Sequence, residues 1–154
     1  MSWWLNRSEH ELTEVVPAAP DAVQAFYADL DNLRQLHPLI VSVRRVAHTD
    51  TPDGYRRTYR VRDRIPLGPL ALPISYRTEL QVHRSATAPR VDADARQFPR
   101  IRLVSTVHFE PVAAGTRLTE ALTITAPRPL AGVTTRQALA AHTEMLAGIR
   151  RSFG

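Results

Sequence analysis

The hairpin that decides the fold spans residues 101–126, with the sequence IRLVSTVHFEPVAAGTRLTEALTITA. Apolar and polar residues alternate on both sides of Ala113-Ala114-Gly115, which is the pattern of strands with one buried face. A two-residue turn at 113–114 would set the strand pairing as follows: Phe109 with Leu118, Val107 with Glu120, and Ser105 with Leu122. The stretch therefore predicts an antiparallel hairpin that lends one face to a core.

Similar alternation continues through the preceding sequence. The strands predicted from 40 onward are 40–49, 54–64, 72–84, 89–97, 101–112 and 115–126, and an earlier strand is predicted at 8–16. Pro20 suits the first turn of a short helix, and Asp31 suits the cap of a second that Pro38 ends. Turn residues separate the strands closely enough that consecutive strands form hairpins.

A final helix is predicted over 134–152. Thr134 and Gln137 have the spacing of a capping box, and an apolar face repeats at intervals of three and four residues. This face consists of Leu139, His142, Leu146, Ile149 and Phe153. The element order indicates an α+β fold in which a curved seven-stranded antiparallel sheet, with two short helices, is covered by this long helix. We expect one domain over 1–154, with 1–7 as a loose tail.

The centre of the covered face is built from small side chains. These are Thr78, Ala93, Ala95 and Ser105, with larger residues around them. Either helix and sheet approach closely there, or a cavity remains for a small apolar molecule, because protein interiors are close-packed. The ligand-binding residues predicted for such a cavity are Tyr55, Arg57, Tyr59, Tyr76, Ala93, Ala95, Leu103, Ser105, Val107, Glu120, Leu122, His142 and Met145.

Three polar side chains project into this apolar set: Arg57, Glu120 and His142. Buried charge needs a partner. One interpretation pairs them internally, for example Arg57 with Glu120 or His142 with Ser105. The other uses them to orient a ligand or to move a proton, which makes all three candidate catalytic residues.

Residues 65–73, IPLGPLALP, are unusually apolar for a strand connection. They could cap the open end of the core, touch a membrane, or gate the cavity. The predicted gating residues are Ile65, Pro66, Leu67, Gly68, Pro69 and Leu70. The same three roles are possible for Trp3 and Trp4.

Composition narrows the function classes. The formal net charge is +5, yet all twenty basic residues are Arg, spread along the chain among fifteen acids. This distribution argues against a nucleic-acid partner and leaves peripheral membrane contact open. The chain has no cysteine and no His pair at metal-ligand spacing, so we expect no metal and no cofactor. A cytoplasmic monomer or homodimer is the simplest expectation.

Three segments carry a family resemblance: 18–23 (AAPDAV), 31–38 ending in Leu36-His37-Pro38, and 63–69 (DRIPLGP) leading to Ile74-Ser75-Tyr76. With the element order, they resemble the START-like SRPBCC superfamily over residues 8–152, and within it the bacterial branch described as polyketide cyclase/dehydrase and lipid transport. The resemblance implies a helix-grip fold with a deep cavity. It also implies a ligand such as a lipid, sterol, plant hormone or polyketide, with the connection at 65–73 as a gate. No catalytic motif of the family transfers to this chain.

Three functions compete at this point. The first is binding or transport of a small hydrophobic ligand, lipid or polyketide-like. The second is a polyketide cyclase, aromatase or dehydratase that uses His142 or Glu120 for proton transfer and Arg57 to stabilise an enolate. The third is an adaptor that docks on a membrane or nucleic acid through arginines.

Overall fold

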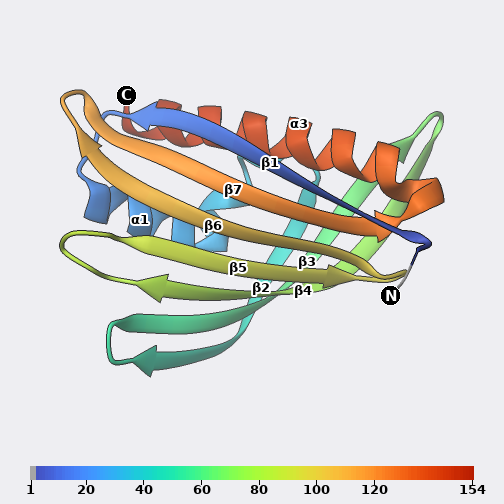
Figure 1. The fold of residues 1–154 in the computed structure, drawn as a ribbon, viewed down its shortest axis with the longest axis horizontal. Helices are drawn as coiled ribbons and strands as arrows, with labels where there is room; N and C mark the ends of the chain where they lie inside the picture. The colour runs from blue at the N-terminus through green and yellow to red at the C-terminus, as the bar shows by residue number, and fades with distance from the viewer. Residues whose placement is uncertain (1–2) are drawn as a thin grey trace.

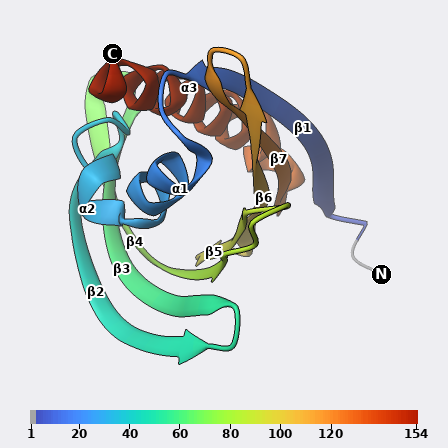
Figure 2. The ribbon, with the colours of Figure 1, turned by 90° about the vertical axis from the view of Figure 1, so that its left-hand side faces the viewer.

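The computed structural model describes residues 3–154, except for the side chain of Leu67. Seven strands form one antiparallel sheet in the order β1-β7-β6-β5-β4-β3-β2. The sheet curls around α3, and β2 and β1 form its two edges (Figures 1 and 2). The strands are β1 Leu5–Val16, β2 Ile40–Thr51, β3 Gly54–Leu67, β4 Leu70–His83, β5 Arg90–Gln97, β6 Ile101–Val112 and β7 Gly115–Pro127. The α+β helix-grip prediction is confirmed.

The predicted hairpin is also confirmed in its register. Val112 pairs with Gly115 across the two-residue turn, and the predicted partners of Phe109, Val107 and Ser105 lie opposite them. The pairing continues as expected into β5, where Ala93 faces Ser105. A two-residue turn leaves one register that buries the apolar face, which explains this agreement.

The helices depart from prediction at their ends. The short helices are α1 Pro20–Ala28 and α2 Leu30–Leu33. Asp29, not Asp31, caps α2, because the Asp29 side chain accepts a hydrogen bond of 3.0 Å from the Asp31 amide. The cap therefore lies earlier in the chain than predicted, and Asp31 is inside the first turn.

The long helix α3 spans Arg128–Phe153 and begins six residues before the predicted start. Pro129 falls within its first turn, where a missing N–H breaks no helical hydrogen bond. Thr134 therefore lies inside the helix, and the predicted capping box is wrong. Gln137 instead donates a hydrogen bond of 3.0 Å to the carbonyl of Pro66.

Two further expectations about the chain ends and loops are corrected. β1 begins at Leu5, so residues 5–7 are part of the sheet, while residues 1–2 of the predicted tail lie outside the described residues. The segment 65–73 is not a loop, because Ile65 pairs with Leu72 in a continuous β3–β4 hairpin. Gly68, with φ of 59°, occupies its turn, where a side chain would be strained.

The inner face of the sheet is covered by α1 as well as α3, contrary to the expectation that only the last helix covers it (Figure 2). The ring of Tyr27 on α1 meets Phe109 edge to face, with centroids 5.9 Å apart. The hydroxyl of Tyr59 lies 3.4 Å from the Ala28 carbonyl. Helices α1 and α2 thus fill one half of the groove formed by the curved sheet, and their buried apolar residues belong to the hydrophobic core. No helix in residues 3–154 combines the length and apolar content needed to cross a membrane.

Candidate ligand cavity

A cavity of about 530 Å³ lies in the half of the groove that α1 and α2 leave uncovered. Its walls are the first turns of α3, the ends of β3 to β6 and the segment after α2. It is lined by His37, Leu39, Asp63, Ile65, Leu72, Pro73, Ile74, Ser75, Tyr76, Ala95, Gln97, Phe98, Pro99, Ile101, Leu103, Leu130, Val133, Thr134, Gln137, Ala138 and His142. Most of these side chains are apolar and a few are titratable, which is the usual composition of a small-molecule site.

The structure divides the predicted ligand-binding residues between the two halves of the groove. Those that line the cavity are Tyr76, Ala95, Leu103 and His142. Those outside its lining are Tyr55, Arg57, Tyr59, Ala93, Ser105, Val107, Glu120, Leu122 and Met145. Of the small side chains at the centre of the covered face, only Ala95 borders the cavity. Tyr27 of α1 packs over the region around Ser105.

The predicted gating segment contributes through its strands rather than its tip. Ile65 of β3 lines the cavity together with Leu72, Pro73 and Ile74 of β4. Pro66, Gly68, Pro69 and Leu70 are exposed at the hairpin tip, and the side chain of Leu67 lies outside the described residues. The hydrogen bond from Gln137 to Pro66 connects this hairpin to α3 across the cavity.

Glu120 and His142 pair with each other, which neither predicted pairing included. Oε1 of the fully buried Glu120 lies 2.6 Å from His142 Nδ1, and the Tyr27 hydroxyl donates to Oε2 at 2.5 Å. Burial opposes both charges, but the mutual attraction outweighs it, so the pKa of His142 is raised and that of Glu120 is lowered. Nδ1 of His142 is thereby held as a donor, and Nε2 remains available to the cavity.

His37 lies beside His142 on the cavity wall. The two rings are 5.3 Å apart and nearly perpendicular. Burial, with the neighbouring His142 charge, lowers the pKa of His37 to about 3. Its Nδ1 accepts a hydrogen bond of 3.3 Å from the Leu39 amide, so the neutral ring carries its proton on Nε2.

Asp63 and Tyr76 form a second polar pair on adjacent strands. The Tyr76 hydroxyl donates to Asp63 Oδ1 at 3.2 Å. Burial raises the pKa of Asp63 to about 6 and that of Tyr76 well above its usual range. Asp63 therefore changes its protonation near neutral pH, while Tyr76 stays a neutral donor.

Arg57 is not part of this polar group. Its guanidinium stacks on the Tyr55 ring at 4.4 Å and donates to His48 Nδ1 at 3.0 Å. Since Glu120 is satisfied by His142 and Tyr27, the predicted Arg57–Glu120 pair is wrong. Arg57 belongs to the filled half of the groove.

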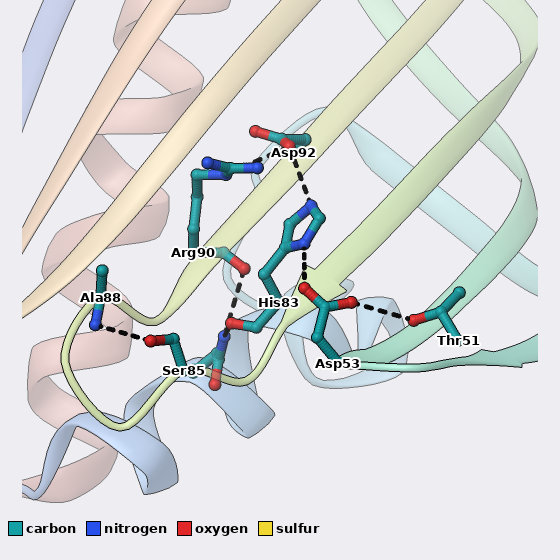
Figure 3. Close-up of polar contacts among 8 residues, drawn as sticks. Thr51, Asp53, His83, Ser85, Ala88, Arg90 and Asp92 are labelled. Atoms are coloured by element: carbon teal, nitrogen blue, oxygen red, sulfur yellow. Dashed lines mark hydrogen bonds and ion pairs between the residues drawn. The ribbon is translucent and has the colours of Figure 1, made fainter.

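A second histidine–carboxylate cluster lies outside the cavity (Figure 3). The ring of His83 is held between Asp53 at 2.7 Å and Asp92 at 3.3 Å. Gln24 of α1 donates to the carbonyls of His83 and Arg90, which connects that helix to β4 and β5. In residues 3–154, no three His, Asp or Glu side chains have a metal-binding arrangement. This cluster fastens the filled end of the molecule.

Sequence reasoning missed two titratable residues of the cavity, His37 and Asp63. The signal for Asp63 was present, because inner-face residues alternate along β3 at Tyr59, Val61 and then Asp63. No such periodicity exists for His37, which follows α2 in an irregular segment. Its place depends on tertiary packing against α3.

The fold and the lined cavity define a helix-grip protein that holds its site between sheet and C-terminal helix. Residues 9–153 match the family described as "Polyketide cyclase / dehydrase and lipid transport". The chain belongs to this family, within the SRPBCC superfamily. No curated protein matches the sequence.

Solved structures show the same fold at low sequence identity. A protein from Thermus thermophilus is 21% identical, with a TM-score of 0.67 over 96% of this chain and 94% of that one. The Zhui aromatase/cyclase from a Streptomyces species is 16% identical, with a TM-score of 0.61 over 96% and 94%. The di-domain ARO/CYC StfQ of the steffimycin biosynthetic pathway is 14% identical, with a TM-score of 0.71 over 96% of this chain and 50% of that one. At these identities the likeness establishes the fold alone.

Proposed function

We propose that the chain binds one small, mostly apolar molecule in the cavity and orients it by one oxygen-bearing group. The observation that carries this proposal is the composition of the cavity wall. Apolar side chains surround about 530 Å³, while His37, Asp63, Tyr76 and His142 supply its titratable groups. That volume is within the range of about 300–1,000 Å³ that small-molecule sites occupy. A carbonyl or hydroxyl oxygen could accept a hydrogen bond from His142 or His37, and a hydroxyl group could also donate one to Asp63.

Mass spectrometry under native conditions tests binding directly. Protein purified from its source cells should carry a discrete added mass that denaturation releases. Leu103→Trp should lower the bound fraction, because the larger ring takes up space inside the cavity. Val46→Trp, which adds the same group on the exposed part of β2, should retain it. A ligand-free wild-type chain that also fails to take up an apolar fluorescent dye would contradict the proposal.

Catalysis on the bound molecule is a second candidate, favoured by the two polar pairs. Asp63, with a pKa of about 6, is mostly ionised at neutral pH and can accept a proton from carbon next to a carbonyl. His142, with its raised pKa, can donate a proton to the carbonyl oxygen. This is the acid–base chemistry of an enolisation, which a polyketide cyclase, aromatase or dehydratase requires.

Substitution of Asp63 distinguishes catalysis on the bound molecule from binding alone. If the chain is an enzyme, Asp63→Asn should lower turnover of an identified substrate by about a hundredfold or more. Binding of that substrate should remain, because Asn keeps the shape and the hydrogen-bonding capacity. Unchanged turnover in both Asp63→Asn and His142→Gln would rule out catalysis by these two residues, and only the binding proposal would remain.

The predicted cytoplasmic location stays a prediction, which fractionation of source cells would test.

A further inference from the structure

Exposed apolar side chains gather at the mouth of the cavity. We define the mouth rim as Trp3, Trp4, Leu70, Leu72, Phe98 and Leu130. The most exposed of them are Phe98 at 90%, Trp3 at 78% and Leu70 at 72%. They come from the N-terminal segment, the β3–β4 hairpin, the β5–β6 turn and the start of α3, which share one end of the molecule (Figure 1). Leu72, Phe98 and Leu130 also line the cavity, so the rim surrounds its opening.

Specific contacts hold the rim in place. The Arg128 amide donates to the Trp4 carbonyl at 2.8 Å, and the Arg128 guanidinium donates to the Trp3 carbonyl. The Arg100 guanidinium stacks over the Trp4 ring at 5.3 Å. Indole rings are therefore presented next to arginines at the surface, rather than on an unattached tail.

The rim segments carry only positive charge. Residues 3–8, 64–75, 96–103 and 126–138 contain no Asp or Glu. Their arginines are Arg7, Arg64, Arg96, Arg100, Arg102, Arg128 and Arg136. Glu9, outside these segments, forms an ion pair with Arg7, and Asp94 forms ion pairs with both Arg96 and Arg102. Arg64, Arg100, Arg128 and Arg136 form no ion pair with any carboxylate in residues 3–154.

We infer that the mouth rim docks the cavity opening on an anionic lipid membrane. Tryptophan and phenylalanine would enter the interfacial layer, while the long arginine side chains reach the lipid phosphates. Tryptophan favours this layer, and each basic residue near an anionic surface strengthens attachment. An apolar ligand could then pass between bilayer and cavity without crossing water. Docking does not depend on which molecule the cavity holds.

The shape of the rim favours a membrane over a protein partner. Its apolar residues project from separate segments around an opening, so they offer no continuous surface for a complementary protein core. A fluid lipid surface adapts to such projections. A second copy of this chain would also bring the unpaired arginines of two rims together, which is unfavourable.

Vesicle flotation tests the inference with two lipid compositions. Wild-type chain should bind vesicles of phosphatidylcholine with phosphatidylglycerol, and should bind weakly to phosphatidylcholine alone. Trp3→Ser with Phe98→Ser should reduce partitioning about tenfold or more, because interfacial burial of two large aromatic rings is lost. Arg64→Glu with Arg136→Glu should reduce it at least twentyfold, about fivefold for each positive charge removed. Raised salt should weaken binding.

Arg60→Glu with Arg77→Glu is the matched control. Both arginines are exposed on the outer sheet face and lie outside the four rim segments, and the charge change is the same. This variant should retain most vesicle binding. An equal loss in this control, or no wild-type preference for phosphatidylglycerol, would overturn the inference. So would light scattering that shows rim-dependent dimers without vesicle binding, since the rim would then join two chains.

The cavity variant keeps the two proposals distinguishable. Leu103→Trp should carry less of the small molecule and still bind vesicles as the wild type does, because it leaves the mouth rim unchanged. Circular dichroism of each variant confirms that a loss reflects the surface rather than unfolding.

Discussion

The two halves of the inner sheet face use the same strands but are covered differently. Along β6, Phe109 and Val107 lie under α1 and are buried, whereas Leu103 and Ile101 border the cavity. Side-chain size on the sheet does not decide this difference, since small Ser105 belongs to the filled half. The cavity exists because α1 and α2 end before they reach the start of α3. Secondary-structure length therefore places the site, and side chains give it its chemistry.

The largest contrast between the halves should appear in core truncations. Phe109→Ala in the filled half should lower the free energy of unfolding by about 3–5 kcal/mol, because close-packed neighbours cannot collapse into the space. Leu103→Ala, beside the cavity, should cost about 2 kcal/mol or less, since the residue has fewer neighbours to lose. Urea denaturation of both variants checks this prediction. Equal losses would mean that the open half is packed as tightly as the filled half.

Asp63 should make the open half less stable at neutral pH than in acid. Its folded-state pKa of about 6 exceeds its unfolded value, so the folded state holds the proton more tightly. Ionisation therefore erodes stability as the pH rises from about 4 to 6, and the full penalty is present above that window. Asp63→Asn should raise the free energy of unfolding by about 1–3 kcal/mol at pH 8, and have little effect near pH 4. Denaturation at both pH values tests this, and a destabilised variant at pH 8 would contradict it.

The Glu120–His142 pair joins the two halves, because Glu120 contacts Tyr27 of α1 and His142 lines the cavity. The raised pKa of His142 means that its stabilisation is complete below the unfolded pKa of about 6.5. That stabilisation is lost as the pH rises through the folded-state pKa of His142. The pKa of Glu120 is lowered, so the stabilisation from its ionised form is lost as the pH falls through its folded-state pKa.

Glu120→Gln should lower the free energy of unfolding by about 1–3 kcal/mol at pH 7, because a buried His142 loses its charged partner. It should also flatten the decline of stability above pH 7. His37 and Asp63 do not titrate there, since their folded and unfolded pKa values lie at or below about 6.5. Chemical denaturation between pH 7 and 9 would reveal the slope. A variant with the wild-type slope would show that another group controls it.

The sequence predicted the sheet far better than the way it is covered. Strand pairing follows from alternation and from turns such as Ala113-Ala114, which are local signals. Helix α1 has only nine residues, so its pattern does not indicate which part of the sheet it covers. The role of Tyr27 was missed for that reason. The start of α3 was also missed, because Pro129 is tolerated in the first turn of a helix and does not mark its boundary.

The candidate site was predictable only in part. Tyr76, Ala95, Leu103 and His142 followed from the phase of the strands and the helix face. The Glu120–His142 contact joins residues on β7 and α3, and no spacing rule connects those elements. Its prediction requires the tilt of α3 over the sheet, which depends on how α1 and α2 fill the other half.

The outer face of the sheet can be compared with both halves of the inner face, because it is exposed to solvent behind each of them. One row of it places like charges opposite each other across five strands: Arg44 with Arg60, Arg60 with Arg77, Arg77 with Arg96, and Arg96 with Arg102. Opposed like charges are destabilising, whereas opposite charges at such positions contribute roughly 0.2–1 kcal/mol.

Arg77→Glu should therefore raise the free energy of unfolding by about 1 kcal/mol or less at low ionic strength, because Glu would face Arg60 and Arg96. The gain should diminish in high salt, which screens exposed charges. Urea denaturation at two salt concentrations measures it, with Thr58→Glu as a control beside Glu79, where the added carboxylate should destabilise. If Arg77→Glu were destabilising at both salt concentrations, side-chain packing along the row would matter more than charge. The stability of the outer face would then depend on packing, as that of the inner face does.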